Sequence, residues 1–478
     1  MTRRRLAAAL GIAGLVAALV PAQAAAHGLV VRADLPIPEW LFAWGAAIVL
    51  IVSFVALAVL WPKPRLEPER WRPLSARVGR ALTSVPVELL AGAIGVALLL
   101  IVVWSGLAGV QSPQANFAPT FVYVIFWLGL VPVSLIFGDL FRAFNPWRAI
   151  GRGFSWVARR GSRGGLPEPL PYPPWLGRWP AALALVAFVW LEIVAESGNT
   201  PSTVAIATLV YSGVTFLGMA LYGVEAWIDR AEGFSVYFNL ISRVSPLERR
   251  GREIGVRRPL SGLATLTPLP GTVALLMVMI GSVSFDGLSG GPTWQSIVPG
   301  LQDFFASLGF GPARTLELAF GVGLIGTILL VSGFYALGAA GVRSVGGARS
   351  ETGAARAFVH SLVPIAIVYA AAHYVSFLLI QGQAIAFLAS DPLGEGWNLL
   401  GTAASTIDYG VIGTNAVWYL QVGFVVTGHV AALVLAHDRA LVLYEKARVA
   451  VRSQYWMLAV MVGFTTLALW LLSQANQG

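Results

Sequence analysis

The chain has 478 residues, of which 57% are hydrophobic and 12% are charged, and its formal net charge is +9. Soluble domains carry about 25% charged residues, so this composition excludes an ordinary soluble enzyme or binding domain. Nucleic-acid binding is excluded as well, because Lys and Arg fall in short loops between apolar runs of near membrane-span length. Cysteine is absent, which excludes disulfides, thiolate metal sites and cysteine nucleophiles. The predicted fold is all-α, a polytopic helical membrane bundle.

The first 26 residues have the pattern of a secretory signal peptide. Three arginines at positions 3–5 precede an apolar core at 6–20 and small residues at 24–26. An uncleaved first helix is the alternative, but the core is short for a membrane span and ends at Pro21. Cleavage after Ala26 would make His27 the mature N-terminus and leave residues 27–478 as a single integral membrane domain.

Ten apolar runs follow the signal peptide, and each predicts a transmembrane helix. The predicted spans are residues 39–61, 87–110, 120–138, 179–196, 203–223, 270–285, 315–338, 357–380, 414–436 and 455–473.

The distribution of Lys and Arg predicts which side each connection faces. Of the 32 Lys and Arg, 27 fall in five alternate connections, at 63–80, 142–178, 230–258, 343–356 and 439–452. Cytoplasmic loops carry an excess of these residues, so the five connections are predicted to be cytoplasmic. The predicted location is the cell membrane, in contact with the lipid bilayer, with the mature N-terminus and the C-terminus both extracytoplasmic.

Two of the cytoplasmic connections carry a structural prediction. Residues 142–178 are predicted to be irregular, because glycines at 161–165 precede a run of prolines. Residues 225–247 mix charged and aromatic side chains. They predict either an amphipathic helix at the inner membrane interface or a helix packed on the bundle.

Four of the five histidines lie between residues 356 and 439, in or beside two predicted spans. They are His360, His373, His429 and His437. Titratable groups inside apolar helices are costly and are therefore functional candidates. The alternative is that each histidine is hydrogen-bonded to a neighbouring helix and has a structural role.

His373 lies toward the extracytoplasmic end of its predicted span, with Tyr369 and Ser376 on the same face of the helix. A histidine in this setting can be a general base, a proton relay or a metal ligand. We predict His373, Asp286 and Asp408 as catalytic residues. The acidic candidates on this side of the membrane are Glu192, Glu196, Asp286, Glu317, Asp391 and Asp408.

A divalent metal ion, Zn or Cu, is the predicted cofactor. A mature N-terminal His27 would chelate through its amine and its imidazole, and imidazole suits both metals. The predicted metal ligands are His27, His373, His429 and His437. No single helix can supply two of them to one ion, so the site would be assembled between helices. For His437 the alternative is a polar group at the membrane interface.

Several short segments, spread over nearly the whole chain, carry a family resemblance. They are residues 27–30 (HGLV), 34–38 (DLPIP), 40–44 (WLFAW), 138–142 (GDLFR), 145–148 (NPWR), 232–236 (EGFSV), 284–288 (SFDGL), 290–294 (GGPTW), 372–374 (AHY), 381–383 (QGQ), 428–429 (GH) and 436–441 (AHDRAL). In these segments the chain resembles a family of bacterial multi-pass membrane proteins labelled fenitrothion hydrolase. The resemblance implies hydrolysis of a hydrophobic organophosphorus triester, with release of a nitrophenol.

Three functions follow as hypotheses. The first is a metal-dependent hydrolase of hydrophobic organophosphorus triesters. The second is a metal or proton-coupled transporter that uses His373 and His429 as stations along its path. The third is a structural or assembly partner whose histidines only pack. The expected partners are a hydrophobic small molecule or a metal ion, and no nucleic acid.

Overall fold

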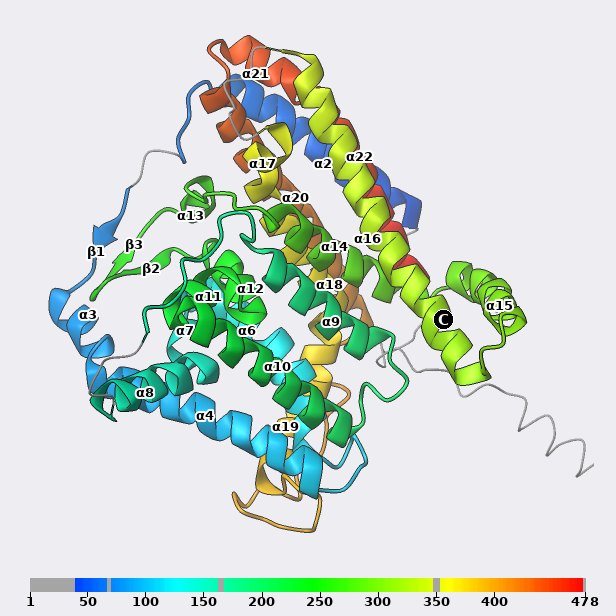
Figure 1. Ribbon diagram of the computed structural model, residues 1–478. Helices are drawn as coiled ribbons and strands as arrows, with labels where there is room; N and C mark the ends of the chain where they lie inside the picture. Colours follow the sequence, from blue (N-terminus) through cyan, green and yellow to red (C-terminus); the bar gives the residue numbers. More distant parts are fainter. Residues whose placement is uncertain (1–38, 67–69, 162–166, 347–352, 476–478) are drawn as a thin grey trace, which may run out of the picture.

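The computed structural model describes residues 39–66, 70–161, 167–346 and 353–475. These residues form an all-α bundle with one small three-stranded sheet (Figure 1). The predicted fold class is confirmed at this level. The predicted signal peptide and His27 lie outside the described residues.

A helix lies at each of the ten predicted positions. Eight of these segments are single helices, and the other two are composite. The single helices are α2 (Glu39–Leu60), α4 (Val85–Ala108), α9 (Trp179–Ile193), α10 (Pro201–Tyr222), α14 (Thr272–Ser289), α16 (Pro312–Ser344), α20 (Thr414–Leu443) and α22 (Tyr455–Ala475).

Both composite segments change helix type close to a proline. The first joins α5 (Phe117–Pro119), the π-helix η1 (Thr120–Gly129) and α6 (Leu130–Phe137). The second joins α17 (Ala354–Phe358), the 3₁₀ turn η2 (Val359–Ser361), α18 (Leu362–Gln381), the 3₁₀ turn η3 (Gly382–Ala384) and α19 (Ile385–Ser390). Pro132 in α6 and Pro364 in α18 have no N–H to donate to the preceding turn, and a regular α-helical ladder is broken there.

Among the described residues, seven helical segments are long and apolar enough to cross a membrane. They are Val85–Ala108, Phe117–Phe137, Pro201–Tyr222, Thr272–Ser289, Pro312–Ser344, Ala354–Ser390 and Thr414–Leu443. Two further apolar helices, Trp44–Leu60 and Trp179–Ile193, are shorter. The chain is therefore a multi-pass membrane protein in contact with lipid. The count of ten crossings and the side on which each end lies stay predictions.

The prediction that residues 142–178 are irregular is wrong for about half of this connection. It contains α7 (Phe141–Phe144) and the amphipathic helix α8 (Pro146–Gly161). The Asn145 side chain accepts a hydrogen bond from the Arg148 N–H at 2.8 Å, and Pro146 occupies the first helical position. Both features favour helix initiation.

The connection at 225–247 packs into the bundle rather than lying along the membrane surface. It forms α11 (Val224–Arg230) and α12 (Gly233–Ser242). Nearly every side chain of α12 is buried. The Glu232 carboxylate caps α12 by accepting from the N–H groups of Phe234 and Ser235. The packed-helix interpretation is confirmed for α12.

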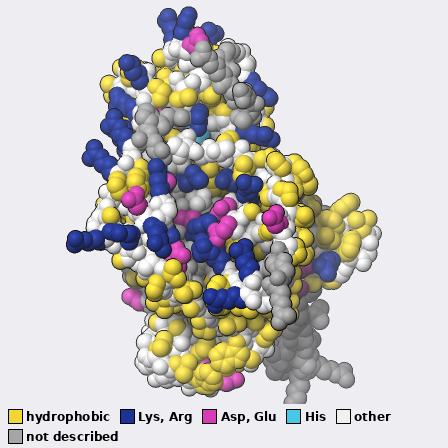
Figure 2. Space-filling view, turned by 60° about the vertical axis from the view of Figure 1, so that its left-hand side comes forward, with side chains coloured by type: hydrophobic (Ala, Val, Ile, Leu, Met, Phe, Trp, Pro, Cys, Tyr) yellow, Lys and Arg dark blue, Asp and Glu magenta, His cyan; other side chains and the backbone are white. Residues whose placement is uncertain are grey.

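A small sheet joins two of the connections that are predicted to be cytoplasmic. Strand β1 (Arg72–Pro73) and strand β2 (Leu247–Arg250) both pair antiparallel with β3 (Glu253–Val256), which lies between them. The face that carries this sheet, α3 (Ala76–Leu82) and α8 has many Lys and Arg side chains (Figure 2). This gathering supports a common side for these connections.

Helix α14 is the centre of the bundle. It packs against α9, α16, α18 and α22, and its side chains are buried on all faces. Helices α18 and α20 form the most extensive helix pair. They approach closely at Gly428, where an added Cβ atom would lie 2.1 Å from a Val368 methyl group. The remaining helices are α13 (Ser261–Ala264), α15 (Pro292–Ser307) and α21 (Ala447–Ser453).

Candidate functional site

The packing of α14 against α18 brings two of the predicted catalytic residues into contact. Asp286, in the last turn of α14, and His373, in the middle of α18, are separated by 87 residues in the chain. The Asp286 Oδ2 atom lies 2.8 Å from His373 Nε2. Both side chains are 6% exposed. This distance is that of a charge-assisted hydrogen bond.

Tyr374 is a third member of this cluster. Its hydroxyl donates to Asp286 Oδ2 at 2.7 Å, so one carboxylate oxygen receives two neighbouring side chains of α18. Tyr369 and Ser376, which the sequence places on the His373 face, do not contact Asp286 in this way. The Tyr369 hydroxyl is paired with Ser284, and the Ser376 Oγ has no partner among the described residues.

The arrangement fixes which nitrogen of His373 is basic. If Nε2 carries a proton and donates it to Asp286, the lone pair of the neutral ring is on Nδ1. Gly287 faces this edge of the ring. A Cβ atom at position 287 would lie 3.7 Å from His373 Nδ1 and Cε1. Glycine at this position therefore places no side chain against this edge of the ring.

A second carboxylate, Glu192, lies beside the cluster. It is in the last turn of α9, it is 7% exposed, and its Oε2 atom has no hydrogen-bond partner among the described residues. Glu192 interacts electrostatically with Asp286 and with Tyr374. A buried carboxylate oxygen without a partner is costly for stability, so its retention points to a functional role.

Two more tyrosines complete the surroundings of Glu192. Tyr123 and Tyr237 both interact electrostatically with Glu192. The Tyr123 hydroxyl donates to the Gly198 carbonyl at 2.8 Å, and the Tyr237 ring stacks on Trp127 at a centroid distance of 4.4 Å. We call Glu192, Asp286, His373 and Tyr374 the polar cluster. Of these, Tyr374 is not among the sequence candidates, because its contact depends on where α14 packs.

Asp408 is not brought to the polar cluster by the contacts that the structure describes. It lies in the exposed part of the connection between α19 and α20. Its Oδ1 atom accepts from the Gly410 N–H at 2.8 Å, and its backbone pairs with the Gln383 side chain. The geometry describes a turn, and the predicted catalytic role of Asp408 receives no support from it.

His429 is buried in α20, directly after Gly428, where α20 contacts α18. Its Nδ1 atom lies 2.7 Å from the Val425 carbonyl, to which an Nδ1–H would donate. The Nε2 atom has no partner among the described residues. In this tautomer Nε2 carries the lone pair, so His429 has the orientation of a ligand or of a proton station.

His437 has partners for both ring nitrogens. Its Nε2 lies 3.0 Å from the Trp61 carbonyl, and its Nδ1 lies 3.3 Å from the Gln454 amide nitrogen. The neighbouring Asp438 accepts from the Trp61 indole and from the Arg65 N–H. These bonds attach the segment after α2 to α20, so the geometry favours a structural role over the predicted metal ligation.

The described residues do not supply a complete metal site. No three His, Asp or Glu side chains in this part of the chain are placed to hold one ion, whereas protein metal sites use three or four such ligands. A Zn or Cu site would need ligands from outside the described residues, such as His27. The predicted cofactor therefore stays a prediction, and no chemistry below depends on it.

No protein-family model, curated protein or solved structure matches this chain. The function is consequently argued from the polar cluster itself.

Proposed function

We propose that the protein is a proton-coupled membrane transporter that moves protons through Asp286 and His373. The observation that carries this proposal is the polar cluster, which is buried within the bundle. Asp286 is bound by His373 and Tyr374 and lies beside Glu192, whose Oε2 atom has no partner among the described residues. Intramembrane acid and histidine side chains that pair with each other are the usual components of proton pathways.

The chemistry of the cluster suits reversible proton transfer. A proton that binds His373 at Nδ1 forms an imidazolium, and Asp286 stabilises its charge across the 2.8 Å contact at Nε2. The Nε2 proton can then pass to Asp286 Oδ2, with Nδ1 retaining the proton that entered. Glu192 is a second acceptor within electrostatic range of Asp286. The unpartnered Nε2 of His429 supports a further station in α20.

The position of the cluster along the bundle supports entry from one side. Asp286 and Glu192 both lie in the last turn of their helices, α14 and α9. In the predicted topology these helix ends face the extracytoplasmic side. The side chains of the cluster are only 5–7% exposed. This burial leaves little room for a phosphotriester with three substituents and favours proton transport over hydrolysis.

Proteoliposomes that enclose a pH-sensitive dye test the proposal. A pH gradient is imposed at a potential clamped with valinomycin and K⁺, with no metal, with Zn²⁺ or with Cu²⁺ outside. We expect the internal pH to change faster than in protein-free liposomes in at least one condition. We expect Asp286→Asn to slow this change by about a hundredfold, the scale of losing one positioned proton-transfer group.

Asp303→Asn is the matched control, because Asp303 is an exposed carboxylate on α15. It is expected to retain the rate of the unmodified protein. Rates equal to those of protein-free liposomes in all three conditions would contradict the proposal, and so would equal rates for Asp286→Asn and Asp303→Asn.

A hydrolase is the second candidate, and one observation favours it. Asp286 holds His373 at Nε2 and leaves Nδ1 next to Gly287, which is the arrangement of a histidine general base oriented by a carboxylate. The resemblance to proteins labelled fenitrothion hydrolase supports the same candidate. If the protein is a hydrolase, we expect the purified protein to release nitrophenol from fenitrothion and His373→Ala to abolish the release. A rate unchanged by His373→Ala would exclude it.

A further inference from the structure

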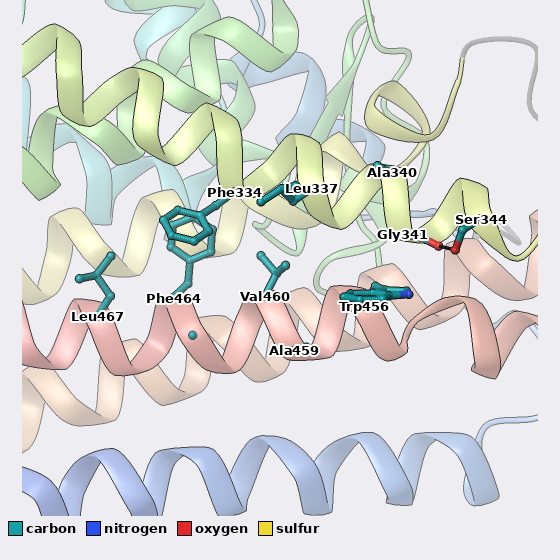
Figure 3. A pocket seen from close by; sticks show the side chains of 11 residues that line it. Phe334, Leu337, Ala340, Gly341, Ser344, Trp456, Ala459, Val460, Phe464 and Leu467 are labelled. Carbon is teal, nitrogen blue, oxygen red and sulfur yellow. Dashed lines mark hydrogen bonds between the residues drawn. The ribbon is translucent and has the colours of Figure 1, made fainter.

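A groove lies between α16 and α22, and all the residues that line it belong to these two helices. Its volume is about 670 Å³, within the range of small-molecule sites. No member of the polar cluster lines it, so the groove is independent of the proposed proton path. Figure 3 shows side chains from the two helices facing each other along its length.

The lining of the groove is apolar over most of its length. At one end the Phe334 and Phe464 rings meet edge to face, with centroids 5.5 Å apart. Leu337 lies in the middle and is 64% exposed. Trp456, at the other end, is 57% exposed. Since α16 is long and apolar enough to cross a membrane, the exposed Leu337 side chain faces lipid hydrocarbon.

The Trp456 end of the groove is polar and basic. Ser344, the last residue of α16, lines this end, and Arg343 precedes it. Helix α21, which leads into α22, packs against α16 and carries Arg448 and Arg452. All three arginines are exposed. None of them has an ion-pair partner in the part of the chain that the structure describes. A tryptophan beside free arginines is the composition of a membrane interface facing anionic headgroups.

We propose that this groove binds an anionic phospholipid, with one acyl chain lying between α16 and α22 and the phosphate group at Arg343 and Arg452. The order of apolar and charged side chains along the groove matches the order of acyl chain and headgroup in the lipid. Hydrocarbon contacts run from Phe334 to Leu337, an interfacial tryptophan follows, and positive charge lies at the end.

The chemistry of the groove favours a lipid over a helix. An acyl chain is thin and flexible and has no polar groups, which matches a lining that offers it no hydrogen bonds. The exposed arginines at the Trp456 end complement an anionic headgroup, which an apolar helix would not supply.

The test uses the full-length protein exchanged into vesicles that contain equal amounts of phosphatidylglycerol and phosphatidylcholine with the same acyl chains. After extraction in mild detergent, the lipid that stays bound is measured. We expect phosphatidylglycerol to be retained preferentially. In the double variant Arg343→Gln, Arg452→Gln we expect its affinity to fall by about 25-fold, the combined effect of two interfacial arginines.

A second variant blocks the groove without disturbing the fold. Gly463 lines the groove, and a Cβ atom added there would have no neighbour within 4 Å. Gly463→Leu is therefore expected to extend into the groove and to abolish retention of both lipids. Gly326→Leu is the matched control, since it places the same side chain on an equally open face of α16 outside the groove.

Three outcomes would overturn the proposal: equal retention of the two lipids, unchanged retention in Gly463→Leu, or loss of retention in Gly326→Leu as well. Conversion of a dimer into monomers by Gly463→Leu, with bound lipid unchanged, would identify a second copy as the occupant and would also overturn it.

Discussion

Asp286 illustrates how a single carboxylate oxygen organises a buried site. Its Oδ2 atom receives the His373 ring and the Tyr374 hydroxyl, from two adjacent residues of α18. Adjacent residues on a helix point about 100° apart, so they reach one atom only because Asp286 lies between their directions. The two bonds hold the ring and the carboxylate in one geometry, which a proton relay requires at every turnover.

The Tyr374 bond is expected to contribute measurably to stability. Tyr374→Phe removes the hydroxyl donor and leaves the buried Asp286 Oδ2 atom with one hydrogen bond fewer. The free energy of unfolding should therefore fall by about 1.5–3 kcal/mol. Unfolding in detergent measures this change. Tyr419→Phe is the control, because Tyr419 is 52% exposed on α20. Equal stability of the two variants would show that the Tyr374 bond is not formed.

Asp139 lies outside the membrane-spanning segments, and its carboxyl group is expected to make the stability of the protein depend on pH. Burial raises the pKa of Asp139 above its usual range, although Asn239 donates to its Oδ2 and lowers the pKa in part. Because the pKa is raised in the folded state, the contribution of Asp139 to stability is present at acidic pH and is lost as pH rises through the folded pKa.

Asp139→Asn removes this titration while keeping the shape of the side chain. The stability of the variant relative to the unmodified protein is therefore expected to increase as pH rises from 4 to 8. Thermal unfolding of both proteins across this range checks the prediction. A difference that stays constant with pH, or one that decreases as pH rises, would contradict it.

At the scale of elements, the contact between α18 and α20 depends on a residue without a side chain. Helix interfaces in membranes rely on small residues that let backbones approach closely. At Gly428 the Val368 methyl groups occupy the space where a Cβ atom would lie. Since α18 carries His373 and α20 carries His429, the spacing of these helices also sets the spacing of the two candidate proton stations.

Gly428→Ala is expected to force α18 and α20 apart and to lower the free energy of unfolding by about 1–3 kcal/mol, the usual cost of overpacking. Gly423→Ala lies on the same helix, and its added Cβ atom would have no neighbour within 4 Å. It is expected to be neutral or stabilising, because alanine is the better helix former. The same loss of stability in both variants would refute a specific contact at Gly428.

The helices themselves were predictable, while their ends and contacts were not. An apolar run marks the part of a helix inside lipid, but α16 and α20 continue as helix through Arg343 and through His437 to Arg439. The hydropathy of the sequence falls at these helix ends, but the helical hydrogen bonds of the backbone continue. His373 could be predicted as a costly group in an apolar segment, and Asp286 as an acidic residue just beyond the predicted span 270–285. Their contact joins residues 87 apart and depends on the packing of α14 against α18, which no local pattern encodes.

For the whole molecule, the distribution of charge predicts the orientation in the membrane. The chain has no cysteine, so a single introduced cysteine reports its side of the membrane without background. Ser405 and Lys63 are both exposed. In intact cells, a membrane-impermeant maleimide is expected to label Ser405→Cys and not Lys63→Cys. Labelling in the opposite pattern would invert the predicted topology and place the polar cluster on the cytoplasmic side.

The measurement that tests the proposed proton path most directly compares two buried histidines of the same composite helical segment. His373 and His360 are 5% and 2% exposed, and only His373 contacts Asp286. In the proteoliposome assay, we expect His373→Gln to slow the change of internal pH by about a hundredfold, while His360→Gln retains the rate of the unmodified protein. Proton movement that persists unchanged in His373→Gln would contradict the assignment of this site.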